Sequence, residues 1–459
     1  MSGQYRHGNK LVVGATRSGK SVSEVNDVIA AAMRKDVAIV LLDPHPRSLA
    51  WNVFSHLVAR GMEHRVIFDQ LPYFSRVPAY RFLPQSTARN SLKRAAQHEQ
   101  YAQTFTDILC RRRSASSATL STSPQTEEWT LKAIRFLLHQ RQERPASDLR
   151  YVFKPGHPIF NLLLHQCTDP DTLFDFHQIA EGSVRRSQFA AAERLISGVC
   201  GSPAFIARCG TTFDLPKFLS NAGILIVEGG GDGVSGDTMR TIMGALILQV
   251  IQYVRTRSGS KPRVLLVMDE ATNAGLISQH EVHALAECQK MGLDLHILVQ
   301  LLDFPSSQVA AGVMTNCIRH EWFYASDPAV ARKAADDLGL SSEEADSVRK
   351  LKIGERYVKT RHGVQREQVE MMDDPWVWPG LAVIKTHKAL SRIRKRPEYQ
   401  EFTCKGQSTG ENETTPSFAE QHNMSAQSGT FSRSSHRNRQ PTEESTSSKN
   451  MDAFDRLHP

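Results

Sequence analysis

Long apolar runs, paired cysteines and a secretory leader are all missing from this sequence of 459 residues. The longest apolar candidates, residues 223–227 and the interrupted segment 242–251, fall short of the roughly 20 residues that a membrane-spanning helix needs. The N-terminus is polar and leads straight into an apolar strand, so no signal peptide is predicted. None of the seven cysteines stands in a C-x-x-C pair, which favours free thiols in a reducing compartment over zinc or disulfide frameworks. We therefore expect a cytoplasmic protein, recruited to the inner membrane only through partners.

Composition is that of an ordinary globular protein with a basic excess. Hydrophobic residues make up 40% and charged residues 23%, and the length is enough for two or three domains. The net charge of +8 indicates a polyanionic partner, and Arg and Lys cluster at residues 111–113 and 392–396. Basic runs are more often solvated helix ends, so charge alone does not identify the partner.

One short motif carries specific chemistry. The segment "VVGATRSGKSVSEV", residues 12–25, contains G-x-x-x-x-G-K-[ST] with every position in place. Its glycines let backbone N–H groups fold around a phosphate, Lys20 is expected to reach the β- and γ-phosphates of ATP, and Ser21 to ligate Mg²⁺. The predicted nucleotide-binding residues of this loop are Gly14, Ala15, Thr16, Arg17, Ser18, Gly19, Lys20 and Ser21.

The surroundings of the motif argue against a chance match, which is expected in on the order of 1–2% of chains this long. Residues 11–13 form a short apolar strand signal. Residues 21–33 place apolar side chains at helical spacing on one face. A strand, a loop and a helix in this order are what a phosphate-binding loop requires.

Strand and helix signals along the rest of the chain alternate, interrupted by one helical region. Apolar strands at residues 37–42 and 66–68 precede a stretch of helical periodicity, and sheet character returns at residues 223–227. After residue 399 the composition shifts to Ser, Thr, Asn, Gln and Glu, which predicts disorder. We predict an α/β fold with a mostly parallel sheet. Its predicted parts are residues 1–86 and 221–398 as two pieces of one core, residues 87–220 as an all-helical insertion, and residues 399–459 as a disordered tail.

Hydrolysis needs more than a phosphate loop, and the ends of later strands supply candidates. The strand "RVLLVMDE" ends in Asp269, predicted to hold Mg²⁺ through its water shell, and in Glu270, predicted to act on water. Gln300 ends the strand "LHILVQ" and is predicted to sense the γ-phosphate. Asp43 ends another strand and is predicted to lie in the same row, where open α/β sheets bind ligands. For each of these the alternative is a solvated or structural side chain at a strand end.

Together these motifs resemble the HerA/FtsK-type motor ATPases. The segments "VVGATRSGKS", "VLLDPHPRS", "VLLVMDEATNAG" and "ECQKMGLDLHILVQ" occur in that family's order, and the chain is most similar to TraG/TraD-type coupling proteins of type IV secretion and to HerA-like ATPases. The resemblance covers roughly residues 9–375, with Trp129 in "EEWTLKAIRFLL" similar to the all-helical domain of coupling proteins. It implies a RecA-like core, ATP and Mg²⁺ as ligands, DNA as cargo, and a homo-oligomeric ring that is usually hexameric.

The sequence also departs from this family. No membrane segment or barrel precedes Lys10, and Gln289 stands where members often carry an arginine that acts on a neighbour's nucleotide. Lys290, Arg319 and Arg208 are the candidate substitutes.

The resemblance predicts an ATP-hydrolysing DNA translocase, and two other classes stay open. One is an adaptor that binds ATP and a protein partner without moving DNA, and the other is a small-molecule P-loop enzyme. Stimulation of ATP hydrolysis by DNA distinguishes the motor from the adaptor. Segments 257–263 and 385–396 are the predicted phosphate contacts, while the glycine-rich loop 228–237 carries three acids and no Lys or Arg. A relaxase, a nuclease or a secretion channel is the expected protein partner, and the strandedness of the DNA is left open.

Overall fold

The computed structural model describes residues 6–73, 75–84, 86, 90–114, 122–259, 261–341, 344–370 and 379–402, without the side chains of residues 111–114 and 379. The chain divides into two units, residues 1–403 and 404–459, and every description here concerns the first. Apart from its first residues, the predicted tail lies outside the described part, as do the side chains of the basic cluster 111–113. No described helix is both long and apolar enough to cross a bilayer.

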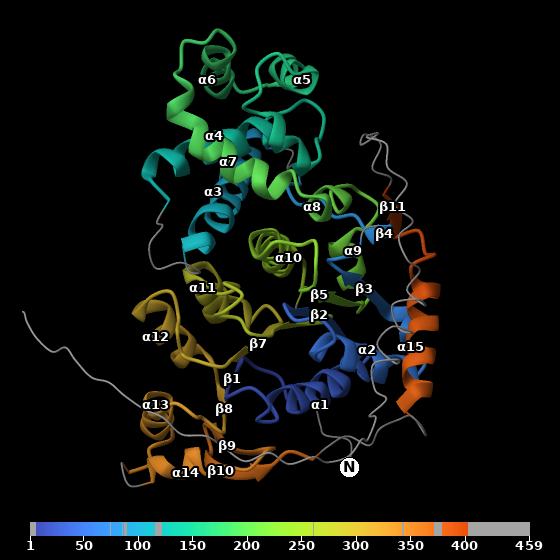
Figure 1. Cartoon of the computed structure of the whole chain (residues 1–459), viewed down its shortest axis with the longest axis vertical. Coiled ribbons are helices and arrows are strands. Elements are labelled where there is room, and N and C mark those ends of the chain that lie inside the picture. The colour runs from blue at the N-terminus through green and yellow to red at the C-terminus, as the bar shows by residue number, and fades with distance from the viewer. Residues whose placement is uncertain are drawn as a thin grey trace, which may run out of the picture. The chain divides into compact units, whose positions relative to one another are not determined.

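A nine-stranded sheet, mostly parallel as predicted, forms the centre of the unit (Figure 1). Its order is β10-β9-β8-β1-β7-β6-β2-β5-β3, with parallel pairing from β3 to β8 and antiparallel pairing from β8 to β10. The strands are β1 (Lys10–Val13), β2 (Val37–Asp43), β3 (Val66–Gln70), β5 (Ile224–Glu228), β6 (Arg263–Met268), β7 (Leu293–Val299), β8 (Arg319–Phe323), β9 (Glu355–Thr360) and β10 (Gly363–Gln368).

The central strands are apolar on both faces because helices cover both faces. Along β2, Val40 packs into one core and Leu41 into the other. The helices α1 (Lys20–Ala32), α2 (Leu49–Ala59) and α15 (Pro379–Ile393) cover one face, and α10 (Gly236–Thr256), α11 (Gln279–Cys288), α12 (Ser307–Asn316) and α13 (Pro328–Leu338) contribute to the core on the other (Figure 1).

The described part of the segment between β4 (Arg76–Pro78) and β5 is mainly helical and packs on α10. Proline stands at the first or second position of five of its described helices, where the missing N–H costs no hydrogen bond. Its helices are α3 (Ser91–Ser114), α4 (Pro124–Leu138), α5 (Pro158–Gln166), α6 (Pro170–Ala180), α7 (Arg186–Cys200), α8 (Pro203–Ala207) and α9 (Leu215–Ser220).

Two features of the fold depart from the sequence prediction. The β9–β10 hairpin, preceded by α14 (Ala345–Arg349), extends the sheet with antiparallel strands. The strand β11 (Tyr399–Glu401) pairs with β4, and its Tyr399 is buried, so the folded chain continues past the boundary predicted at residue 398. The burial of Tyr399 stabilises this strand although the residues that follow it are polar.

Candidate nucleotide site

The glycine-framed loop between β1 and α1 is tied to two neighbouring strands. The N–H of Gly14 donates to the carbonyl oxygen of Val299 at the end of β7, over 3.2 Å. The N–H of Ala15 donates to the carbonyl oxygen of Tyr324, just beyond β8, over 2.8 Å. The loop therefore lies at the carboxyl edge of the sheet, where open parallel sheets bind ligands.

Both framing glycines are required by close packing. A Cβ on Gly14 would lie 2.6 Å from the Cβ of Phe323. Gly19 has φ +108°, and a Cβ there would lie 2.9 Å from the Cα of Gly354. Among the other loop residues, Thr16 and Arg17 are exposed, Ala15 is partly buried and Ser18 is buried.

Lys20 opens α1 and is directed back into the loop. Its Nζ donates to the carbonyl oxygen of Gly14 and lies 3.7 Å from Oε1 of Glu270. Burial lowers the pKa of Lys20, although the charges of Glu270 and Asp269 act in the opposite direction. Ser21 follows in the first turn. Because α1 begins directly after the loop, the positive end of its helix dipole faces the loop, and the first turn contains no acidic residue.

The two acids and the glutamine predicted at the ends of β6 and β7 are neighbours in space. Oε1 of Glu270 accepts from Nε2 of Gln300 over 2.7 Å, and Oε2 accepts from Nδ2 of Asn273 over 3.0 Å. Glu270 has φ +46°, an uncommon conformation for a residue with a side chain, and its N–H donates to Oδ1 of Asp269 over 3.0 Å. Sequence reasoning missed Asn273, although it follows in the same segment, "DEATNAG".

The carboxylates at this edge are crowded. Burial raises the pKa of Asp269 to about 7, and the charges of Asp43 and Glu270 act in the same direction. Burial also raises the pKa of Asp43 to about 7. A divalent cation at this edge would relieve the crowding, because it stabilises the ionised form of the carboxylates.

Asp43 ends β2 beside β6 and so lies in the predicted row, but its side chain is engaged within the chain. It is fully buried, and its two oxygens accept from the N–H groups of His45 and Ala50, over 2.9 and 2.8 Å. Its own carbonyl oxygen accepts from the N–H of Gly229 over 2.7 Å, which holds the glycine-rich loop 228–237 against it. Asp43 therefore orders two loops and influences Asp269 through its charge, and it has no exposed surface for a nucleotide.

A cavity of about 410 Å³ opens beside the phosphate loop. Its lining includes Ala15, Thr16 and Gln300 on one side and the segment 324–327 after β8 on the other. A ligand that fills this cavity therefore contacts both the phosphate loop and Gln300.

Of the candidate substitutes for the family's arginine, Arg208 is excluded. Its side chain has no exposed surface, its Nη2 lies 2.6 Å from Oδ1 of Asp69, and it also donates to the carbonyl oxygens of Gln70 and Tyr73. A side chain fixed inside its own subunit cannot reach a neighbour's nucleotide. Arg208 instead joins the helical segment to β3.

Arg319 and Lys290 both lie at the amino edge of the sheet, away from the phosphate loop. Arg319 begins β8 and is held by Glu321, with 2.8 Å between Nε and Oε1. Lys290 follows α11 and is exposed. Both stay candidates.

The β9–β10 hairpin supports the phosphate loop, which sequence reasoning did not predict. The N–H of Gly354, just before β9, donates to the carbonyl oxygen of Ser18 over 2.8 Å. Arg356 on β9 donates to the hydroxyl of Ser23 on α1 and to Oε2 of Glu321, the latter over 2.6 Å. The signal in the sequence is the segment "IGERYVK", a glycine followed shortly by Tyr357 and Val358, residue types that favour strands.

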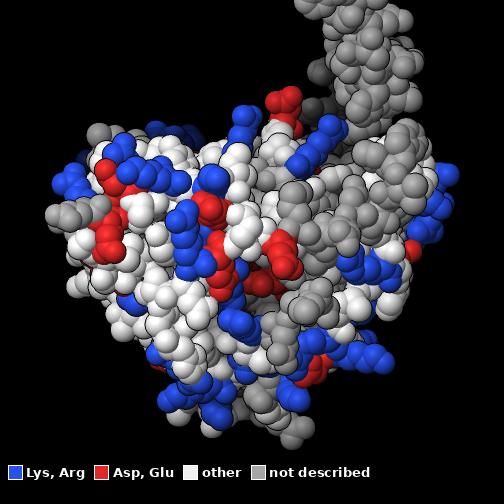
Figure 2. Space-filling view, turned by 90° about the horizontal axis from the view of Figure 1, so that it is seen from below, with Lys and Arg blue, Asp and Glu red and all other residues white. Residues whose placement is uncertain are grey.

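The two basic segments predicted to contact DNA are partly structural. In segment 257–263, Nη2 of Arg263 lies 2.5 Å from Oδ1 of the buried Asp294. In segment 385–396, Arg394 and Arg396 bond to β3 and the residues before it, and so fasten α15 to the core. On the visible residues of the face seen from below, Lys and Arg lie interspersed with Asp and Glu (Figure 2).

Comparison with solved structures identifies the fold. The conjugative coupling protein TrwB without its first 70 residues, in an unbound form, aligns with 80% of this chain and 85% of its own at a TM-score of 0.55 and 17% identity. The chain has the fold of TrwB. TrwB in complex with ADP and Mg²⁺ aligns with 86% of this chain and 88% of its own at a TM-score of 0.54 and 17% identity.

VirB4 of Thermoanaerobacter pseudethanolicus shares the fold, at a TM-score of 0.52 and 16% identity over 80% of this chain and 90% of its own. The fold that the resemblance implies is therefore confirmed. No protein-family model matches the sequence. A search of curated proteins finds no match either.

Proposed function

We propose that this chain is an ATP-hydrolysing DNA translocase of the coupling-protein type, which moves DNA through an oligomeric ring. The observation that carries the proposal is the convergence of Lys20 and Gln300 on Glu270 beside the phosphate loop. Oε1 of Glu270 lies 3.7 Å from Nζ of Lys20 and 2.7 Å from Nε2 of Gln300. The fold shared with TrwB supports it, because structures of TrwB hold ADP with Mg²⁺ and a non-hydrolysable ATP analogue.

The residues present fit ATP and Mg²⁺. The hydroxyl of Ser18 is buried in the loop without a hydrogen-bond partner among the described residues, where a phosphate oxygen can supply one. Ser21 and Asp269 would hold Mg²⁺, directly and through its water shell. Bound Mg²⁺ supplies positive charge to the β- and γ-phosphates.

In the proposed reaction, Lys20 leaves its contact with Glu270 to bind the β- and γ-phosphates. Glu270 then accepts a proton from a water molecule whose oxygen bonds to the γ-phosphorus, while the bond from that phosphorus to the β,γ-bridging oxygen breaks and ADP leaves. Gln300 and Asn273 hold the two oxygens of Glu270 and so fix its orientation. Gln300 also lies where it can contact the γ-phosphate.

Assembly into a ring, of six subunits in the proposed form, would complete the site with a cation from the neighbour. Arg319 and Lys290 are the two candidates within the described residues. A relaxase, a nuclease or a secretion-channel protein would deliver or receive the DNA.

The adaptor is the second candidate function, and a specific observation favours it. Gln289 replaces the arginine expected at that position, and Arg319 is already engaged by Glu321. An adaptor would bind ATP but would show no increase in hydrolysis with DNA.

Steady-state ATP hydrolysis with and without DNA tests the proposal. The wild-type chain should hydrolyse ATP faster when DNA is added, and Lys20→Ala should abolish hydrolysis. Lys35→Ala is the matched control, because Lys35 is exposed just beyond the other end of α1. Hydrolysis that survives Lys20→Ala would show that the site is misassigned, and hydrolysis that ignores DNA would favour the adaptor.

A further inference from the structure

A second large cavity, of about 1000 Å³, lies at the amino ends of β1 and β8, on the opposite edge of the sheet from the phosphate loop. We call it the amino-edge pocket. It shares no lining residue with the cavity beside the phosphate loop. Its size is at the upper end of the range for small-ligand sites.

The wall of the amino-edge pocket is rich in basic side chains. Five Lys and Arg side chains and four histidines line it, against two aspartates. Both aspartates are already engaged. Asp27 lies 2.6 Å from Nζ of Lys10, and Asp337 accepts from His320, Trp322 and Lys359 over 2.7 to 2.8 Å.

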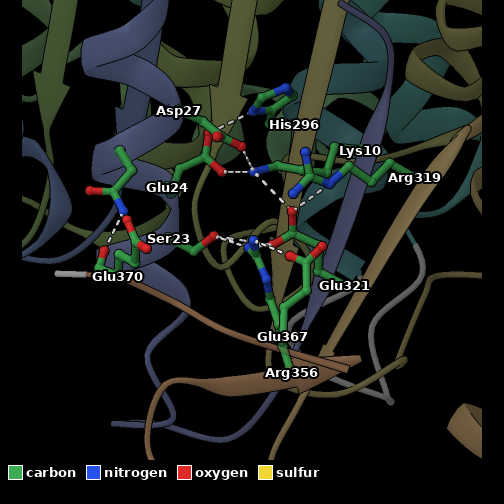
Figure 3. A network of polar contacts seen from close by, with 11 residues as sticks. Lys10, Ser23, Glu24, Asp27, His296, Arg319, Glu321, Arg356, Glu367 and Glu370 are labelled. Atoms are coloured by element: carbon green, nitrogen blue, oxygen red, sulfur yellow. Dashed lines mark hydrogen bonds and ion pairs between the residues drawn. The ribbon is translucent and has the colours of Figure 1, made fainter. Parts of the chain in front are cut away.

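Two further acids, Glu24 and Glu321, are not part of the lining but contact its cations (Figure 3). Glu24 lies 2.6 Å from Nζ of Lys10, and Glu321 is shared by Arg319 over 2.8 Å and by Arg356 over 2.6 Å. Neither glutamate side chain has exposed surface. Within the lining, the five Lys and Arg side chains outnumber the two aspartates, and Glu24 and Glu321 lie outside it, which favours an anion in the pocket.

A metal ion is not the ligand that this arrangement favours. Donor atoms of Glu24, Asp27 and His296 lie within 4.8 Å of one another, but the Nζ of Lys10 lies 2.6 Å from both carboxylates. Burial acts against the charge of Lys10, and the charges of Asp27, Glu24 and Glu321 outweigh it, so the pKa of Lys10 lies above its ordinary value. The ammonium group thus takes the place of a metal cation.

Two exposed arginines extend the basic wall to the rim. Arg6 precedes β1, and Arg361 lies in the turn between β9 and β10. Guanidinium groups match the geometry of phosphate oxygens, and here they face a concave surface that already holds Arg319 and Lys359. We propose that the amino-edge pocket binds a phosphate-bearing ligand, either a nucleic-acid strand or a free nucleoside polyphosphate. This inference rests on the pocket alone and does not require ATP hydrolysis.

The test uses the full chain with Lys20→Ala, so that the phosphate loop contributes little to binding. The double variant Arg6→Ala/Arg361→Ala is compared with Arg185→Ala/Arg186→Ala, an equal change of charge at exposed positions on the helical segment. The probes are a fluorescent single-stranded oligonucleotide of about 20 nucleotides, followed by anisotropy across a salt series, and inorganic tripolyphosphate, followed by calorimetry. Thermal denaturation checks that the exposed substitutions leave the fold intact.

The rim variant should bind at least one probe about tenfold more weakly, and the salt slope for the oligonucleotide should fall by about 1.4 for two lost contacts. Arg361→Glu should weaken binding more than Arg361→Ala. If the rim variant loses affinity for the oligonucleotide alone, the ligand is a nucleic-acid strand. If it loses affinity for tripolyphosphate alone, the ligand is a free polyphosphate. Loss with both supports a site for phosphate chains of either source. Unchanged binding of both probes, or an equal loss in the control, would overturn the proposal.

Discussion

The side-chain amide of Gln300 donates to Oε1 of Glu270 over 2.7 Å, across the ends of two adjacent parallel strands. The same oxygen lies 3.7 Å from Nζ of Lys20. Glu270 is thus oriented by a residue from β7 while it faces the lysine of the phosphate loop. A change at the γ-phosphate that moves Lys20 must also change the surroundings of this carboxylate.

Glu270→Gln should keep nucleotide binding and lose turnover, by about 10²–10⁴-fold, which is typical for a lost acid or base. Gln300→Ala should lower kcat by a smaller factor, because Asn273 still holds the other oxygen. Fluorescent-nucleotide binding and steady-state hydrolysis separate the two effects. Equal turnover in Glu270→Gln and wild type would remove Glu270 from the reaction.

Gly19→Ala should lower the ATP affinity of the phosphate loop in addition to the stability lost through backbone strain. The added Cβ meets backbone atoms of Gly354 at about 3 Å, at a position with φ +108°. Gly182→Ala is the control, because Gly182 also has a positive φ of +76° but has open space around it. Both should lose on the order of 1–2 kcal/mol from strain, and only Gly19→Ala should also lose ATP affinity. Equal ATP affinity in the two variants would contradict the packing argument.

Local chemistry explains what could be predicted at the site. The loop Gly14–Ser21 depends on a contiguous motif, and Asp269, Glu270 and Gln300 each end an apolar strand. Parallel strands end at the same edge of a sheet, so local patterns were enough to bring these residues together.

Contacts between distant segments could not be predicted in this way. Gly354 supports Ser18 from more than 300 residues further along the chain, and no local pattern encodes that pairing. Arg208 had the right charge for a neighbour's site, but its burial against Asp69 depends on how the helical segment meets β3. Asp43 ends a strand as expected, yet the turn that follows it takes up both of its oxygens.

Arg208→Ala should lower the free energy of unfolding and should not impair ATP hydrolysis specifically. Removing the arginine leaves the Asp69 carboxylate buried with the Tyr80 hydroxyl as a partner but without its balancing charge, and breaking a buried ion pair typically costs about 3–5 kcal/mol. Arg186→Ala, at a pair with Glu193 whose arginine is 77% exposed, should cost at most about 1 kcal/mol. Chemical denaturation of both variants measures this. A stable Arg208→Ala chain that lost only its hydrolysis would restore Arg208 as a catalytic candidate.

Asp269→Asn should stabilise the chain without ligand, and more so as the pH rises. The folded-state pKa of about 7 lies above the ordinary value of 3.8, so ionising Asp269 opposes folding. Stability is highest when this group is protonated and declines as the pH rises from about 4 through 7, by on the order of a few kcal/mol. The advantage of Asp269→Asn should therefore grow over that range and level off above pH 7, as followed by denaturation at pH 5, 6, 7 and 8.

Asp36→Asn is the control of opposite sign. Hydrogen bonding to Arg34 holds the pKa of Asp36 at about 2, so its ionised form favours folding and its replacement should bring no gain at high pH. A gain for Asp269→Asn that did not change with pH would point to packing instead of charge.

The basic end of α15 should divide into structural and DNA-contacting side chains. Arg394 donates to Oε1 of Gln70 over 2.7 Å, and Arg396 donates to the carbonyl oxygen of Val66 over 2.9 Å, so both fasten the helix end to the core. Arg394→Ala/Arg396→Ala should lower the thermal midpoint. Replacing the whole cluster 392–396 would mix this loss of stability with any loss of DNA binding.

The exposed lysines of the same segment test DNA contact cleanly. Lys385, Lys388 and Lys395 are exposed, so the triple alanine variant should keep its fold and its DNA-free hydrolysis. If these lysines meet phosphates of duplex DNA, affinity should fall, and the salt slope should decrease by about 0.9 for each contact. Anisotropy with a labelled duplex across a salt series measures both quantities. A slope equal to that of the wild type would assign these lysines to solvent and direct the search to the helical segment around residues 111–113.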